Sequence, residues 1–205
     1  PVMEVVDVNK VMTTLHLMLQ LIKRQHESGV EKVSPDMLGR LFFFSYMWSL
    51  GGLLELDNRI VFEKEFLVRI GAQFLPSVTT PGSSVFDFLV DEEVGDWEPW
   101  SSRIPLWEYP GDNNLNFATL FVPTLDSMRY EYLVNLLVEQ GKHVLVVGNS
   151  GTAKSVTVEK LLRDMDAETM GHKKINFSSA TTPRIFQNTV EGESAALNRF
   201  LPCCM

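Results

Sequence analysis

The stretch VLVVGNSGTAKSVTVEKLL joins an apolar run, a glycine-containing loop and a segment with helical spacing. Its loop fits the pattern G-x-x-x-x-G-K-[ST], in which backbone N–H groups at a helix N-terminus bind phosphate oxygens. Ala153 stands where the second glycine of the pattern is expected. Alanine keeps its N–H, so its cost depends on whether the loop needs a positive φ there. The pattern predicts a phosphate-binding loop (Walker A), and the alternative is a glycine turn that binds nothing.

The loop residues predict a site for ATP or ADP with Mg²⁺. Lys154 is spaced to reach the β and γ phosphates, and the Ser155 hydroxyl is spaced to ligate the metal ion. Successive N–H groups after the first glycine would bind the remaining phosphate oxygens. The expected binding residues of the loop are Gly148, Asn149, Ser150, Gly151, Thr152, Ala153, Lys154, Ser155 and Val156.

Hydrolysis would need more groups than the loop supplies. A second acid must help to hold Mg²⁺, a carboxylate must orient water, and an arginine must meet the charge that develops on the γ-phosphate. The acids usually follow an apolar strand, and the run of that form here is FLVDE, residues 88–92. It precedes the loop and leads into a turn, so we interpret it as a hairpin edge. The alternative is that Asp91 or Glu92 serves a stand-alone P-loop ATPase or kinase.

The first part of the chain predicts a group of helices. Apolar residues at three- and four-residue spacing predict a helix to about His26, after which Ser34 and Pro35 start a second helix that stops at Gly51-Gly52. A third helix is expected near Asp57. Trp48 and the neighbouring aromatics are expected to pack in the core rather than bind a ligand. The residues expected on the inner face of the first helix are Val8, Val11, Met12, Leu15, Met18, Leu19 and Ile22.

The second part predicts short strands and then a P-loop unit. Turn formers from about Gly71 lead to short strands around an acidic turn. Thr124 is expected to cap a helix that Gly141 ends, with Leu125, Met128, Tyr132, Leu133, Leu136 and Leu137 facing inward. A strand at 143–147, a helix at about 153–165 and a strand at 174–178 predict a parallel sheet with a right-handed crossover.

The predicted fold class is therefore α/β: an N-terminal helical bundle, a β-hairpin linker and a truncated P-loop unit with a parallel α/β arrangement. The expected domains are residues 1–75, 76–118 and 119–205.

Composition excludes several classes of function. The net charge is -8 and no basic run is present, so nucleic acid is not an expected partner. No segment reaches the about 18 consecutive apolar residues of a membrane span, so no membrane association is expected. Cys203 and Cys204 are adjacent and the four histidines are scattered, so neither a disulfide framework nor a zinc site is expected.

The sequence resembles the dynein heavy chains, of the axonemal type. VPTLDSMRYEYLVNLLVEQGKHVLVVGNSGTAKSVTVEKLL resembles the start of their third AAA+ module, alanine in the loop included, and INFSSATTP resembles its second strand. FFFSYMWSLGGLLELDNRIVFEKEF resembles the helical lid that closes the second module. Four features occur in the family's order over roughly residues 10–190.

The resemblance implies that the helices of residues 1–75 are lid-like and that the P-loop unit is of the AAA+ type. It also implies a binding site, partners and a location. Phe121, Val122, Pro123 and Thr124 would lie against the adenine. Arg129 matches a family position, although we favour a helix-surface ion pair with Asp126. Partners would be neighbouring AAA+ modules, intermediate and light chains and, indirectly, microtubules. The location would be the cytoplasm and cytoskeleton, in the axoneme of a cilium or flagellum.

The family's acidic strand motif, sensors and arginine from the next module would lie beyond residue 205. We therefore expect a motor fragment whose nucleotide site is regulatory and whose own ATPase activity is weak or absent. Two alternatives stay open: the stand-alone P-loop enzyme, and an interaction fragment that has lost nucleotide binding.

Overall fold

The computed structural model describes residues 4–29, 33–108, 121–165 and 172–197. The chain divides into two compact units, Pro1–Lys160 and Leu161–Met205. The first unit holds the lid-like helices, a hairpin, the helix before the P-loop and the P-loop itself, and the second holds the end of the following helix and the C-terminal helix. The chain thus contains a helical region, a short antiparallel strand pair and part of a P-loop domain, which confirms the predicted fold class. The division into three domains stays a prediction.

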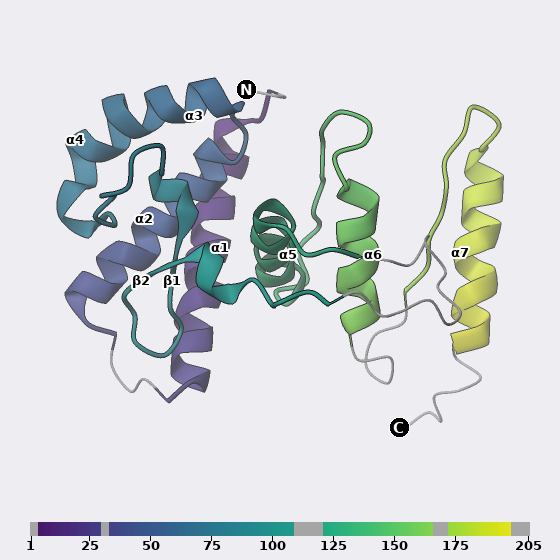
Figure 1. The fold of residues 1–205 in the computed structure, drawn as a ribbon. Coiled ribbons are helices and arrows are strands. Elements are labelled where there is room, and N and C mark those ends of the chain that lie inside the picture. The colour runs from purple at the N-terminus through teal and green to yellow at the C-terminus, as the bar shows by residue number, and fades with distance from the viewer. Residues whose placement is uncertain (1–3, 30–32, 109–120, 166–171, 198–205) are drawn as a thin grey trace. The chain divides into compact units, whose positions relative to one another are not determined.

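The first two helices begin and end where the sequence predicts. Helix α1 spans Asp7–Glu27 and α2 spans Pro35–Gly51, and the two pack along each other (Figure 1). The Ser34 side chain accepts a hydrogen bond from the Met37 N–H at 3.2 Å, which makes it the predicted N-cap. Helix α3 (Leu56–Phe62) follows, then a π-helical turn (Glu63–Leu67), α4 (Val68–Gly71) and a 3₁₀ turn, η2 (Ala72–Phe74).

The predicted inner face of α1 is wrong. Its apolar stripe is largely exposed, from 43% at Met12 to 66% at Val8, and only Met18 and Ile22 are partly covered. The buried face carries Leu17 and Leu21 with polar residues between them. Each of those polar side chains finds a partner inside, which offsets part of the cost of its burial, although Gln25 Oε1 has no partner among the described residues. The pairs are Thr14 with Ser49 at 2.5 Å, Gln20 with Glu139 at 2.6 Å, and Gln25 with the Asp91 carbonyl at 2.9 Å.

The predicted hairpin edge is confirmed. Strands β1 (Phe88–Val90) and β2 (Trp97–Pro99) pair antiparallel with Leu89 opposite Glu98, between the 3₁₀ turns η3 (Val85–Asp87) and η4 (Trp100–Arg103). The Asp91 carboxylate accepts from the N–H groups of Glu93 and Val94, at 2.9 and 2.7 Å, which closes the acidic turn. The hairpin packs against α2 and contributes Leu89 and Val90 to the core, and η4 contributes Trp100.

The end of α2 shows why Trp48 is followed by two glycines. The Phe86 ring packs edge-on against Trp48, and a Cβ at Gly51 would lie 2.4 Å from Phe86 Cζ. Arg59 then closes the helix end, because its Nε donates to the carbonyls of Gly51 and Leu54, at 2.9 and 3.1 Å. Packing and a helix stop, the predicted roles, are confirmed here. The capping role of Arg59 was not predicted.

Helix α5 (Leu125–Val138) starts at the predicted cap, where the Thr124 hydroxyl accepts from the Ser127 N–H at 3.2 Å. Helix α6 (Lys154–Asp164) follows the glycine loop as predicted, and α7 (Pro183–Leu197) was not predicted. The strands expected at 143–147 and 174–178 are not present: among the described residues, the paired strands are β1 and β2. A strand needs a neighbour for its N–H and C=O groups. No described segment supplies one to 143–147, and Leu145 is exposed.

Candidate nucleotide-binding site

The backbone of the loop has alternating left-handed residues before α6. Gly151 has φ +77° and Ala153 has φ +56°. Alternation of this kind turns successive N–H groups toward one side and forms an anion-binding concavity. The left-handed conformation costs a non-glycine residue about 1–2 kcal/mol. Position 153 therefore does need a positive φ, and the alanine carries a strain that glycine would not.

Lys154 folds over the loop. Its Nζ donates to the Asn149 carbonyl and, at 3.1 Å, to the Thr152 hydroxyl, which itself donates to the Asn149 carbonyl at 2.9 Å. These acceptors are neutral, and Lys154 forms no ion pair with a carboxylate of the described residues. The charge of the ammonium group is thus held at the loop without an anion to neutralise it.

A cavity of about 450 Å³ opens beside the loop, within the first unit. Its volume lies in the usual range of small-molecule sites. The walls are partly apolar, from Leu54, Leu56, Val134 and Val146, and partly charged. The charged residues of the walls are Glu55, Arg59, Asp126, Arg129 and Lys154. Apolar side chains in the same cavity as Arg59, Arg129 and Lys154 suit a ligand that carries both a ring system and phosphates.

The cavity contains only part of the predicted binding set. Gly148, Thr152 and Lys154 line it. Other predicted loop residues, which do not line it, are Asn149, Ser150, Gly151, Ala153, Ser155 and Val156, and all of these are exposed. The predicted adenine segment, Phe121, Val122, Pro123 and Thr124, does not line it either. Phe121 instead lies 5.7 Å from Lys160 Nζ, and Thr124 caps α5. The adenine contacts stay a prediction.

Arg129 forms the predicted pair with Asp126, at 3.2 Å, but the expectation of a helix-surface pair is wrong. Arg129 is only 7% exposed, and its Nη2 contacts Asp87 of η3. Its Nε is buried without a partner in the described structure. Asp87 lies 42 residues away in the sequence, which is why local spacing did not reveal it.

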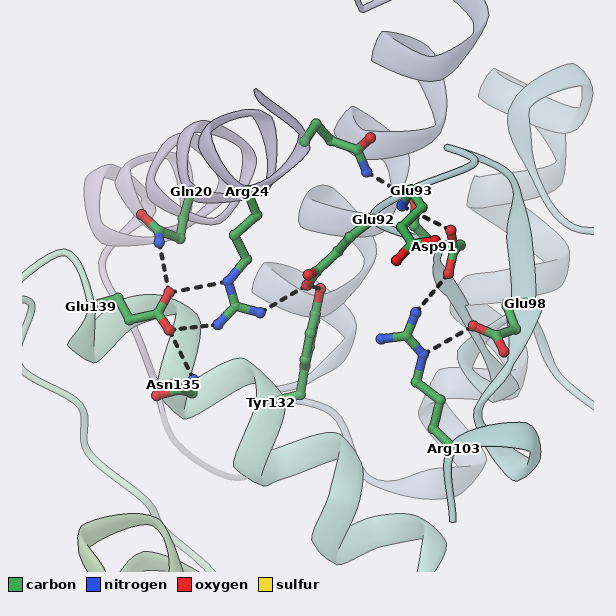
Figure 2. Close-up of polar contacts among 11 residues, drawn as sticks. Gln20, Arg24, Asp91, Glu92, Glu93, Glu98, Arg103, Tyr132, Asn135 and Glu139 are labelled. Atoms are coloured by element: carbon green, nitrogen blue, oxygen red, sulfur yellow. Dashed lines mark hydrogen bonds and ion pairs between the residues drawn. The ribbon is translucent and has the colours of Figure 1, made fainter. Parts of the chain in front are cut away.

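A polar cluster ties α1, the hairpin turn and α5 together (Figure 2). Arg24 donates to Glu92 at 2.8 Å and to Glu139 at 2.7 Å, and the Tyr132 hydroxyl donates to Glu92 at 2.8 Å. Burial, reinforced by the charge of Glu92, raises the pKa of Tyr132 well above its ordinary value. The phenol therefore stays protonated and remains a donor. This cluster fixes the start of the P-loop region against the lid-like helices.

Asp91 and Glu92, the candidate acids of the stand-alone enzyme, have structural contacts. Asp91 bonds Arg103 at 2.8 Å, and Arg103 also holds Glu98 at 2.9 Å (Figure 2). Hydrogen bonds from the turn backbone, the Val94 N–H first, hold the pKa of Asp91 below its ordinary value. Neither acid lines the cavity beside the loop. Nothing in their placement favours a role in hydrolysis.

Helical lid, hairpin and P-loop in this order define a piece of an AAA-type motor region. Comparison with known families agrees, because the model described as dynein heavy chain AAA lid domain matches residues 1–102. The model described as P-loop containing dynein motor region matches residues 109–196. The chain belongs to the dynein heavy chain family.

Its curated relatives include axonemal and flagellar heavy chains. Dynein axonemal heavy chain 5 of Rattus norvegicus is 38% identical over 92% of this chain and 5% of its own length. Dynein axonemal heavy chain 8 of Mus musculus is 40% identical over 93% of this chain and 4% of its own. The dynein gamma chain of the flagellar outer arm of Chlamydomonas reinhardtii is 38% identical over 94% of this chain and 4% of its own length. The chain thus spans about one-twentieth of these relatives.

Proposed function

We propose that this chain is a nucleotide-binding segment of an axonemal dynein heavy chain that takes part in ciliary or flagellar movement along microtubules. The observation that carries the proposal is the loop itself. Two left-handed residues, Gly151 and Ala153, shape it at the start of α6, and Lys154 lies over it with no carboxylate partner among the described residues. That arrangement favours an anionic ligand and fits the phosphates of ATP or ADP.

The residues present fit a nucleotide with Mg²⁺. When bound, the nucleotide would bring phosphate anions and an aromatic base. The backbone N–H groups of the loop, Gly148 to Val156, would bind phosphate oxygens, and Lys154 would leave the Asn149 carbonyl for a charged partner. The Ser155 hydroxyl is exposed and would hold the metal ion. Phe121 to Thr124 remain the proposed contacts of the base.

We propose a regulatory role for the site rather than turnover by this chain. The carboxylates that line the cavity are Glu55 and Asp126, and Asp126 already pairs with Arg129. Occupancy would act by shifting the population of conformations of neighbouring AAA+ modules, since a ligand favours the state to which it binds more tightly. Residues 1–75 would close the preceding module, 76–118 would link, and 119–205 would begin the next.

The partners proposed for the intact heavy chain are its other AAA+ modules, the intermediate and light chains and, indirectly, microtubules. The proposed location is the axoneme, within the cytoskeleton. Among the described residues, no helix combines the length and apolar character needed to cross a membrane.

A titration with a fluorescent ATP analogue tests the binding proposal. The wild-type chain is expected to bind saturably, and Lys154→Ala is expected to weaken binding at least about tenfold, because a charge-assisted contact to phosphate is lost. Lys23→Ala is the matched control, since Lys23 is exposed, forms an ion pair with Glu27 on the surface of α1 and does not line the cavity.

Two results would count against the binding part of the proposal, and two others against the regulatory part. Absence of saturable binding in the wild type would favour the interaction fragment. If Lys154→Ala bound the analogue as tightly as the wild type, the loop would not be part of the binding site. Substantial turnover of ATP that depends on Lys154 would contradict the regulatory role. If Asp91→Asn abolished such turnover while binding persisted, the stand-alone enzyme would be favoured.

A further inference from the structure

Arg129 lies where two cavities share a wall. A second cavity, of about 430 Å³, is lined by residues of α3, the π-helical turn and the segment before β1. It shares Leu56, Arg59 and Arg129 with the cavity beside the P-loop. Arg59 donates to backbone carbonyls near the end of α2 and to the Tyr130 hydroxyl, whereas Arg129 is held by carboxylates.

The partners of Arg129 differ in how firmly they are held. Asp126 is 74% exposed, so water screens its charge. Asp87 is fixed, because its Oδ2 accepts from the Ser84 N–H at 2.8 Å in a capping box. The Ser84 hydroxyl in turn donates to Glu63 at 2.5 Å, on the π-helical turn. A line of contacts therefore runs from the P-loop cavity through Arg129 and Asp87 to the lid-like helices.

We propose that Arg129 is a specificity-determining residue of the nucleotide site, and that Asp87 limits its action by competing for the guanidinium group. The inference rests on the proposed function. Arg129 and Lys154 both line the cavity, so a nucleotide with an additional phosphate gains more from the pair than one without it. Asp87 holds the guanidinium in the absence of that phosphate. Competition of this kind is reciprocal: a triphosphate weakens the Arg129–Asp87 pair, and the pair weakens triphosphate binding.

A purely structural role makes a different prediction. If Arg129 only tied α5 to the segment before β1, loss of either member of the pair would loosen the same contact. Both substitutions would then lower stability, and neither would change the preference between triphosphate and diphosphate. Competition instead requires opposite effects on triphosphate affinity from the two substitutions. The sign therefore separates the two explanations.

The experiment titrates fluorescent analogues of ATP and ADP into the full chain and into three variants. Arg129→Gln is expected to weaken the triphosphate about fivefold or more with a smaller effect on the diphosphate, and Asp87→Asn to tighten the triphosphate about threefold, in the range typical of coupled sites. Glu65→Gln is the control, because it removes an exposed carboxylate that pairs with Arg69 on the surface and lines neither cavity, and it should leave both affinities unchanged.

Thermal unfolding by circular dichroism accompanies each titration. If Arg129→Gln does not fold, Asp87→Asn decides the matter alone. The inference is overturned if Asp87→Asn weakens both nucleotides equally, or if Arg129→Gln leaves the ratio of the two affinities unchanged. If Lys154→Ala abolished binding but the other variants kept the wild-type ratio of triphosphate to diphosphate affinity, only this inference would fail. The proposed function would still hold. No saturable binding in any variant would remove both.

Discussion

Ala153 shows at the scale of one residue what a motif departure costs. Its φ of +56° puts an alanine in the left-handed region. Ala153→Gly would relieve about 1–2 kcal/mol of strain, against a loss of about 0.4–1 kcal/mol from the greater freedom of glycine in the unfolded chain. We expect the variant to be as stable as the wild type or up to about 1.6 kcal/mol more stable. Urea unfolding measures the difference.

The control for that comparison is Ala72→Gly, because Ala72 has φ -49°, in the right-handed helical region. There the same replacement relieves no strain and should destabilise the chain by about 0.5–1 kcal/mol. An equal loss at both positions would show that the loop conformation of Ala153 is not strained. The alanine was visible in the sequence, but its φ was not, because the pattern fixes residue types and not torsion angles.

Gly51 illustrates, at the scale of an element, a close approach between a helix and the segment that covers it. Gly51→Ala would place a Cβ 2.4 Å from Phe86 Cζ. Phe86 is buried against Trp48 and cannot move away cheaply. We expect a loss of about 1–3 kcal/mol in the free energy of unfolding, the usual cost of overpacking.

Gly192→Ala in α7 is the matched control, since no atom lies within 4 Å of its Cβ position. Alanine should stabilise that helix by up to about 1 kcal/mol through its higher helix propensity. Denaturant titration of both variants checks the pair. A neutral result at Gly51 would mean that the approach of Phe86 does not require glycine.

Tyr132 connects α5 to the hairpin turn through Glu92. Tyr132→Phe keeps the ring but removes a buried donor to a carboxylate, which should cost about 1–2 kcal/mol. Tyr130→Phe is the control, because the Tyr130 hydroxyl makes a longer contact, 3.3 Å from Arg59, at an exposed position. Its loss should be within about 0.5 kcal/mol. If Tyr132→Phe lost as little free energy of unfolding as Tyr130→Phe, the cluster in Figure 2 would add little stability.

Local signals predicted the ends of elements better than their faces. Ser34, Pro35 and Thr124 determine helix starts within a few residues, so their positions were predicted from sequence. The inner face of α1 depends on what packs there: the buried amide groups of Gln20 and Gln25 donate to Glu139 and to the backbone of the hairpin turn, far along the chain. A count of apolar residues contains no information about such partners.

At the scale of the whole molecule, the P-loop region shows the same limit. The apolar run at 143–147 was interpreted as a strand, but a strand exists only with a neighbour, and the described residues provide none. The cavity beside the loop likewise combines the α2–α3 turn, α5 and the loop, which are distant in sequence. The loop residues could be predicted from the motif, whereas Arg59 and Arg129 could be placed beside them only by the fold.

The response of stability to pH follows from two carboxylates that lie at the ends of the polar cluster. Backbone hydrogen bonds, the Val94 N–H first, hold the pKa of Asp91 below 3.8. Burial raises the pKa of Glu139, but the hydrogen bonds and charge of Arg24 outweigh burial and bring it below 4.5. A pKa that is lower in the folded chain means that the unfolded chain binds the proton more tightly. The stabilisation is therefore complete above about pH 5 and is lost as pH falls toward 3.

Urea midpoints measured between pH 6 and 3 should therefore decline for the wild type and decline less steeply for Asp91→Asn combined with Glu139→Gln, because these groups no longer titrate. Glu65→Gln serves as the control, since Glu65 is 65% exposed in a surface pair with Arg69 and should leave the slope unchanged. If the double variant kept the full slope, the acid sensitivity would have to come from other carboxylates. Arg24 holds Glu139 at the end of α5 against α1, and Gln25 holds the Asp91 carbonyl of the hairpin turn against α1. The loss at low pH should therefore also loosen α5, which leads into the P-loop region, from the lid-like helices.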